Sequence, residues 1–191
     1  MAERFLRVFV AVKITRPELV SRVKSFQEEL ERAGLKAKFV ETENLHITLQ
    51  FIGEIPREKV QGVASKLMEV KASSFSMELQ GIGAFPNPKN PRVIWIGVRR
   101  GSEELSRLAQ EVYKAVTAAG VKLEREDFQP HLTIARVKAP LGGEVRKIIE
   151  KNSSTFFGEQ DVTKFYLIKS VLTPRGPVYT DLAEFQLLPV H

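Results

Sequence analysis

The feature that most constrains the fold of this chain is a short motif that occurs twice. Residues 45–49 read Leu-His-Ile-Thr-Leu and residues 130–134 read Pro-His-Leu-Thr-Ile, so that the two histidines lie 131 − 46 = 85 residues apart in a chain of 191. Each copy follows a similar order of expected elements, namely a strand, a helix, a short strand and a loop. The sequence therefore predicts two related, duplicated lobes that face each other.

Hydrophobic periodicity along the chain predicts alternating strands and helices. Helices are expected over 17–34, 56–70, 102–119 and 143–152. Strands are expected over 5–14, 36–40, 45–52, 75–84, 92–98, 121–123, 131–138, 164–173 and 178–187, with a hairpin turn at 174–177. No linker splits the chain. We therefore expect one bilobal α+β domain over residues 1–191, with two pseudo-symmetric, mostly antiparallel sheets facing a central cleft and the helices outside.

The composition narrows the class of protein. The 29 Lys and Arg against 23 Asp and Glu give a net charge of +6, which favours phosphate-rich partners. Cysteine is absent, which excludes disulfides, thiol catalysis and zinc sites of the Cys type.

No apolar run approaches about 18 residues and no signal peptide is recognisable, so no membrane contact and a cytoplasmic location are expected. The abundance of Lys and Glu favours a thermophilic source.

The two motifs carry the candidate chemistry. Residues i and i+2 of a strand share a face, so His46 points with Thr48, and His131 points with Thr133. If the lobes face each other, two imidazoles and two hydroxyls meet in one cleft. One imidazole can be neutral while the other is charged, as paired general base and acid catalysis at phosphorus requires. One His-x-Thr alone would favour a structural histidine, but the repeat uses both internal histidines; His191, the last residue, is expected to be frayed.

Other chemistries fit the sequence less well. Two histidines without a carboxylate cluster or cysteine do not complete a zinc or iron site, so no metal and no cofactor are expected. Asp127 lies four residues before His131 and could either orient that imidazole or cap a loop. No Gly-x-Ser-x-Gly turn is present, which leaves a serine nucleophile unsupported.

The flanking segments extend the motifs into a resemblance over nearly the whole chain. The chain resembles the two-histidine phosphoesterase superfamily, and specifically the RNA 2′,3′-cyclic phosphodiesterases once named 2′-5′ RNA ligases. The resemblance implies a bilobal fold with a pseudo-two-fold axis through the cleft, and hydrolysis of a terminal 2′,3′-cyclic phosphate of RNA to a 2′-phosphate without metal. The segments that carry it are 7–11, 43–49, 51–54, 91–98, 130–136, 170–172 and 176–179.

The resemblance also implies roles for individual residues. His46 would be the proton donor to the leaving 3′ oxygen, and His131 the proton acceptor that activates water. Thr48 and Thr133 would hold the phosphate. Arg136 matches a family arginine five residues after the second histidine, where it would contact the phosphate. In an ideal strand this odd spacing points Arg136 away from the cleft, so either a bulge or a strong twist redirects it or it is a surface charge.

Some expectations concern the substrate and its binding. Phe9 is a candidate for stacking on a terminal base, with core packing as the alternative. Lys89, Arg92 and Arg175 lie in or beside loops and are candidates for guiding RNA, with a solvated surface position as the default interpretation of each. The expected partner is RNA that ends in a 2′,3′-cyclic phosphate, bound by a monomer.

The sequence leaves several other functions open. With roughly symmetric histidines the reaction can also run in reverse as 2′-5′ ligation of RNA. The alternatives are a noncatalytic RNA-binding module and a cyclic phosphodiesterase that acts on small nucleotides.

Overall fold

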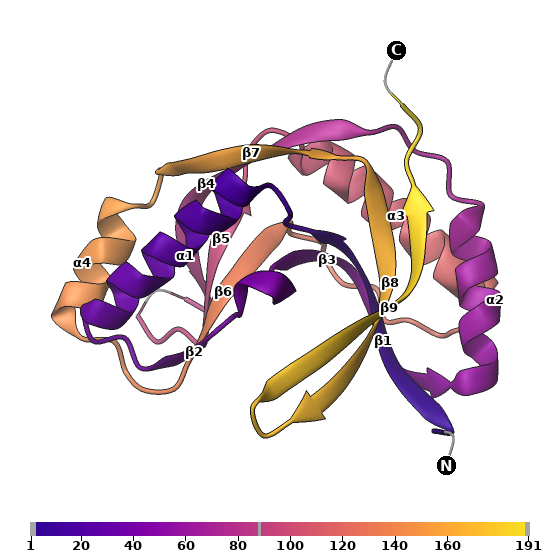
Figure 1. Ribbon diagram of the computed structural model, residues 1–191, viewed down its shortest axis with the longest axis horizontal. Coiled ribbons are helices and arrows are strands. Elements are labelled where there is room, and N and C mark those ends of the chain that lie inside the picture. Colours follow the sequence, from indigo (N-terminus) through magenta and orange to yellow (C-terminus); the bar gives the residue numbers. More distant parts are fainter. Residues whose placement is uncertain (1–2, 88, 190–191) are drawn as a thin grey trace.

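Two antiparallel sheets form the frame of the computed structural model, which describes residues 3–87 and 89–189 (Figure 1). The four-stranded sheet has the order β3 (His46–Pro56), β1 (Phe5–Lys13), β8 (Lys164–Thr173), β9 (Gly176–Gln186). The five-stranded sheet has the order β2 (Ala37–Phe39), β6 (His131–Val137), β5 (Val93–Val98), β4 (Phe75–Phe85), β7 (Phe156–Val162). Each motif strand, β3 or β6, therefore belongs to a different sheet, and the predicted α+β fold is confirmed.

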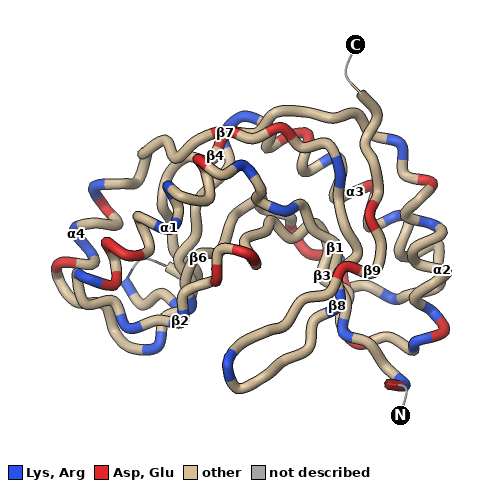
Figure 2. The backbone as a smooth tube through the Cα atoms, in the orientation of Figure 1, with Lys and Arg blue, Asp and Glu red and all other residues tan. Residues whose placement is uncertain are grey.

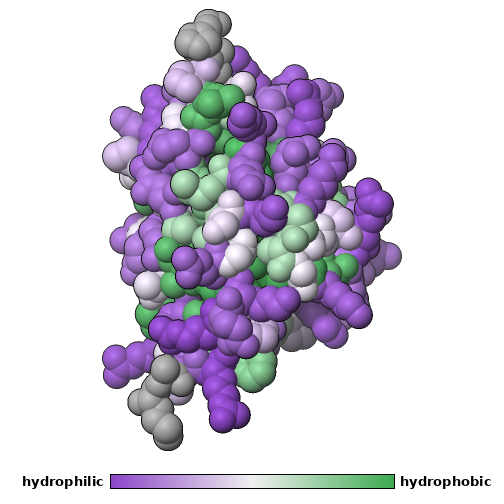
Figure 3. All heavy atoms as spheres, turned by 90° about the vertical axis from the view of Figure 1, so that its right-hand side faces the viewer, coloured by the Kyte–Doolittle hydropathy of each residue, from purple (hydrophilic) through white to green (hydrophobic). Residues whose placement is uncertain are grey.

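Helices cover one face of each sheet. Helices α1 (Pro17–Arg32) and α4 (Gly143–Lys151) pack on the five-stranded sheet, whereas α2 (Arg57–Met68) and α3 (Ser102–Ala118) pack on the four-stranded one (Figure 1). Apolar residues spaced by three and four along α1 give it one buried stripe, in which the Phe26 ring meets the edge of Phe157 in β7. The face that carries α2 is mostly hydrophilic on its outside (Figure 3), as expected for helices whose apolar sides face a sheet.

The two lobes interlock. Their strand orders correspond, since β3-β1-β8-β9 matches β6-β5-β4-β7, and β2 is an additional edge strand of the second sheet. Helix α1, however, follows β1 of the four-stranded sheet and packs on β7 and β6 of the five-stranded sheet. Helix α3 follows β5 of the five-stranded sheet and packs on β3. The lobes are therefore not successive halves of the chain. Helices α1 and α3 each pack on the sheet of the other lobe, β4 of the first half joins the five-stranded sheet, and β8 and β9 of the second half join the four-stranded one.

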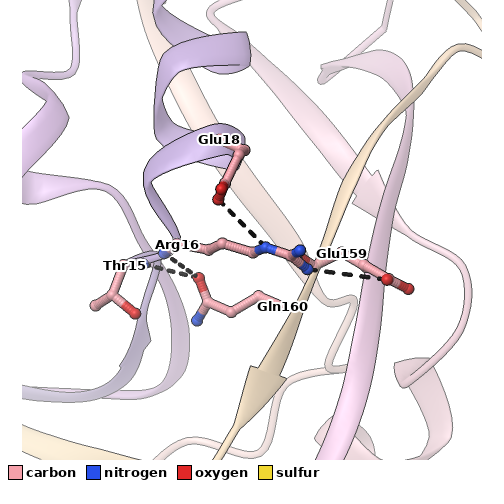
Figure 4. Close-up of polar contacts among 5 residues, drawn as sticks. All are labelled: Thr15, Arg16, Glu18, Glu159 and Gln160. Carbon is pink, nitrogen blue, oxygen red and sulfur yellow. Dashed lines mark hydrogen bonds and ion pairs between the residues drawn. The ribbon is translucent and has the colours of Figure 1, made fainter.

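A buried glutamine ties the two sheets together at the start of α1 (Figure 4). Gln160 of β7 is only 6% exposed, and its Oε1 accepts hydrogen bonds from the backbone N–H groups of Thr15 (2.7 Å) and Arg16 (3.1 Å). Its Nε2 donates to the carbonyl oxygen of Lys13 at 2.8 Å. The Arg16 guanidinium also donates to the carbonyl oxygen of Glu159. The chain that leaves β1 is thereby held against the edge strand of the other sheet.

Two sequence expectations about strands were wrong. Strand β7 was missed, because its sequence, Phe-Phe-Gly-Glu-Gln-Asp-Val, is half polar and it pairs with only one neighbour, β4. The expected strand over 121–123 does not form. The corresponding segment of the first copy, β2, pairs with β6, whereas the outer edge of β3 has no partner strand in the described part of the chain. None of the described helices is long and apolar enough to cross a membrane.

Candidate active site

A cavity of about 500 Å³ lies between the two sheets and brings both motifs together. His46 and Thr48 line it from β3, and His131 and Thr133 line it from β6. Leu45 and the other intervening residues of the motifs point into the apolar core. The strand alternation read from the sequence thus places both imidazoles and both hydroxyls around one space.

Both imidazoles are held by the same contact. Nδ1 of His46 lies 2.7 Å from the carbonyl oxygen of Asn44, and Nδ1 of His131 lies 2.7 Å from the carbonyl oxygen of Gln129. A carbonyl oxygen can only accept, so each Nδ1 carries the proton of this bond. In each ring Nε2 is then the nitrogen that can take up or give a proton. Asp127 does not orient His131, because the Gln129 carbonyl does so.

Aromatic rings surround each imidazole. The ring centroids of Phe9 and Tyr179 lie 5.0 and 5.5 Å from that of His46, and Phe85 lies 5.1 Å from His131. Phe9 lines the cavity but is only 5% exposed, since it packs in a buried cluster with Tyr166, Ile168 and Tyr179. Its position therefore matches the core-packing interpretation, in which it buttresses His46 and offers little surface to a base.

The surroundings of His46 favour its neutral form. Burial lowers the pKa of His46 below its ordinary value of 6.5, and the positive charges of Arg136 and His131 lower it further, against the opposing effect of the Asn44 hydrogen bond. A lowered pKa taken alone suits a base better than an acid. A proton-donor role for His46 therefore requires that an anionic phosphate in the cavity favour the protonated ring.

Removing the charge of Arg136 is expected to raise the pKa of His46. In Arg136→Gln one of the positive charges that disfavour the protonated ring is gone, so the ring keeps its proton to a higher pH than in the wild type. The measurement is an NMR titration of the His46 Cε1–H resonance in both proteins. Arg107→Gln, on the solvent-facing side of α3, is the control for loss of one charge. A pKa of His46 that stays level or falls in Arg136→Gln would contradict this prediction.

A bulge in each motif strand decides which later residues face the cavity. Thr133 pairs with Trp95 and Ala135 with Ile94, so Ile134 is skipped and the alternation of the strand is reversed beyond it. Arg136 consequently lines the cavity, as the bulge alternative predicted. The same slip occurs in β3 at Leu49, between the pairings of Thr48 and Gln50 with β1.

The bulge in β3 brings an unforeseen aromatic residue into the cavity. Phe51 stands five residues after His46, as Arg136 stands five residues after His131, and both line the cavity. The Phe51 ring is 49% exposed, with the Arg7 guanidinium 4.8 Å from its centroid. Phe51 therefore offers much more exposed aromatic surface to the cavity than Phe9 does, with Arg7 over its ring. Applying the five-residue offset to both copies of the motif would have found it.

The remaining candidate residues differ in whether they line the cavity. Arg175 lines the cavity, whereas Lys89 and Arg92 do not. Tyr179 and Lys38 line it without having been singled out in the sequence. His191 lies outside the described residues. Within residues 3–87 and 89–189, no group of three or more His, Asp or Glu side chains is placed to hold a metal ion.

Two facing sheets that each present a His-x-Thr strand to one cavity define the class of two-histidine phosphoesterases. A family model described as "LigT like Phosphoesterase" matches the chain twice, over residues 14–95 and 96–179. The chain belongs to this family. The double match also fits the duplication seen in the motif and in the strand order.

Individual relatives cover almost the whole chain. An RNA 2′,3′-cyclic phosphodiesterase of Archaeoglobus fulgidus is 45% identical over 182 residues, which is 95% of this chain and 100% of the relative. A protein of the same name from Aeropyrum pernix is 36% identical over 87% of this chain and 95% of its own length. The crystal structure of TT0787 of Thermus thermophilus superposes with a TM-score of 0.80 at 31% identity, over 97% of this chain and 100% of that one. Thermophilic sources are thus among the relatives.

Proposed function

We propose that this protein hydrolyses the 2′,3′-cyclic phosphate at the end of an RNA to a 2′-phosphate, with His46 as the proton donor and His131 as the proton acceptor. The observation that carries the proposal is the pair of imidazoles on opposite walls of one cavity, each with Nδ1 held by a carbonyl and Nε2 left for chemistry. The relatives named RNA 2′,3′-cyclic phosphodiesterase support the choice of substrate.

The reaction needs one proton removed and one supplied. Nε2 of His131 takes a proton from water as the water oxygen bonds to phosphorus. The bond between phosphorus and the 3′ oxygen breaks, and Nε2–H of His46 gives that oxygen its proton. One water is consumed, and the 2′-phosphate remains. Each proton transfer by a positioned side chain is worth about 10²- to 10⁴-fold in rate.

The other lining residues would stabilise charge on the phosphate. Thr48 and Thr133 would donate hydrogen bonds to nonbridging oxygens from the two walls, and Arg136 would add a guanidinium; all three line the cavity. Phe51 would stack on the terminal base, because its exposed ring lies in the same cavity. The anionic phosphate between these groups would also favour protonation of His46, as its role as donor requires.

The direct test is hydrolysis of an oligoribonucleotide that ends in a 2′,3′-cyclic phosphate, with a chelator present. We expect turnover in the chelator and a product that ³¹P NMR identifies as a 2′-phosphate. A 3′-phosphate product would overturn the assignment of the leaving group. Tight binding of the same RNA without turnover would instead identify a noncatalytic RNA-binding module.

The same assay bears on the other open alternatives. Turnover of 2′,3′-cyclic mononucleotides but not of the oligomer would indicate a phosphodiesterase of small nucleotides. Addition of a 5′-hydroxyl RNA tests 2′-5′ ligation, in which that hydroxyl replaces water as the nucleophile. A monomeric state, a cytoplasmic location and a single domain over residues 1–191 stay predictions.

A further inference from the structure

The cavity holds more positive charge than one cyclic phosphate needs. Arg7, Lys38, Arg136 and Arg175 all line it, and Glu41 is the one acidic residue among the described lining residues. Within residues 3–87 and 89–189, none of the four cations forms an ion pair, although lysines and arginines elsewhere form ten. A cyclic phosphate diester carries a single negative charge. The surplus indicates a ligand with further anionic groups.

Two of these cations are direct neighbours across the sheet. Lys38 of β2 pairs with Arg136 of β6 in the antiparallel register, an arrangement that puts their Cβ atoms about 4.5–5.5 Å apart. Like charges opposite each other destabilise a sheet unless an anion lies between or beside them. Lys38 is on the edge strand, one strand further from the motif threonines than Arg136. It therefore extends the positive charge of the cavity away from the reacting phosphate.

The hairpin of the other sheet brings the second outer cation to the same place. The β8–β9 hairpin projects from the four-stranded sheet, and Figure 2 shows a basic position at its turn. At Gly176, the first residue of β9 after this turn, φ is +121°, and a Cβ added there would lie 3.3 Å from Cε and 3.7 Å from Nζ of Lys38. The turn therefore lies against the Lys38 side chain, and it is braced by the Thr173 hydroxyl, which accepts from the Arg175 N–H. Lys38 and Arg175, called the rim pair below, thus line the cavity from the two lobes, beside the place where the hairpin approaches β2.

We propose that the rim pair binds the phosphodiester of the nucleotide that precedes the terminal cyclic phosphate, and so selects an RNA strand over a mononucleotide. The inference rests on the proposed function and names its substrate class. Both side chains are exposed, which suits a passing strand rather than a buried ligand. The Lys38 ammonium and the Arg175 guanidinium come from opposite lobes, so they can bind one phosphate group from two sides.

The test compares two substrates in matched variants. The substrates are 2′,3′-cyclic AMP and a short single-stranded oligoribonucleotide ending in the same cyclic phosphate. In Lys38→Gln/Arg175→Gln, the ratio of kcat/KM for the oligomer to kcat/KM for the mononucleotide is expected to fall about tenfold or more, mainly through KM of the oligomer. The slope of log kcat/KM against log salt for the oligomer should become shallower by about 0.7 for one lost phosphate contact.

A control with the same loss of charge separates a local subsite from general attraction. Lys71→Gln/Lys122→Gln also removes two positive charges, from exposed positions that do not line the cavity. Its oligomer-to-mononucleotide ratio should remain that of the wild type. An equal fall of the ratio in both double variants, or no fall in the rim-pair variant, would overturn the proposal.

Failure of the proposed function would give a different result from failure of the rim-pair proposal. A wild-type protein without turnover of either substrate would disprove the enzyme assignment and leave the rim pair testable by binding. Fluorescence anisotropy of a 5′-labelled oligomer ending in a 2′-phosphate then gives its Kd. Weaker binding by about tenfold in the rim-pair variant, with the control variant as the wild type, supports the subsite; equal Kd values in all three proteins refute it.

Discussion

Replacing either cavity histidine with alanine is expected to lower kcat on the cyclic phosphate RNA by about 10²- to 10⁴-fold. Each imidazole would transfer one proton in the same step, so removal of either one leaves that transfer to water. The double variant His46→Ala/His131→Ala should lose far less than the product of the two single effects, because the pair acts as a unit. Single-turnover rates with saturating enzyme measure this directly. A variant of either histidine that keeps the wild-type rate would disprove the paired mechanism.

A change of leaving group distinguishes the two histidine roles. A nucleoside phosphodiester with a p-nitrophenolate leaving group does not need the proton that His46 would donate. With this substrate His46→Ala should recover most of the lost rate, whereas His131→Ala should stay slow because water still has to be activated. Recovery by His131→Ala instead would show that the roles are reversed. That outcome would agree with the lowered pKa of His46 in the free protein.

The second large effect is expected from the motif threonines. Valine has nearly the shape of threonine without the hydroxyl, so Thr48→Val and Thr133→Val each remove a hydrogen-bond donor to the phosphate. We expect kcat to fall about 10²- to 10³-fold in each variant, as for loss of one preorganised donor at a reacting oxyanion. Thr48→Ser and Thr133→Ser keep the hydroxyl and should retain most of the activity.

A further threonine variant and thermal unfolding serve as controls for damage to the fold. Thr163→Val changes an exposed threonine between β7 and β8 that lines neither this cavity nor the pocket beside His46, and it should behave as the wild type. Thermal unfolding of each variant reports any structural damage. If the valine variants unfold like the wild type and keep its kcat, the hydroxyls do not stabilise the transition state.

The part of the site that could be predicted from the sequence is the part that follows regular strand alternation. The repeated motif and the alternation of strands were enough to put His46 with Thr48, and His131 with Thr133, on one face of each strand, because these positions precede the bulges. Their meeting in one cavity was conditional on the two lobes facing each other, and the structure brings them together. Beyond each bulge the alternation reverses, and the position of Arg136 could then only be stated as conditional.

Contacts between distant segments explain the rest. Phe9 and Phe51 both line the cavity, but Phe9 lies on the inner strand β1 and is covered by Tyr166, Ile168 and Tyr179, whereas Phe51 lies on the edge strand β3 and stays half exposed. Strand β7 has little apolar alternation of its own and is held by pairing with β4 and by the Gln160 hydrogen bonds. The neighbourhood of Lys38 and the hairpin turn depends on how the lobes approach each other, which no local pattern encodes.

The exchange of helices between the lobes has a consequence for how such a chain can be divided. A cut between the two copies, near residue 90, would separate α1 from the strand β6 that it covers and α3 from the strand β3 that it covers. Neither fragment could assemble a complete sheet with its own helices, so each would expose apolar surface until it met the other. We therefore expect neither fragment to fold without the other, and the cavity needs both because its two walls come from β3 and β6.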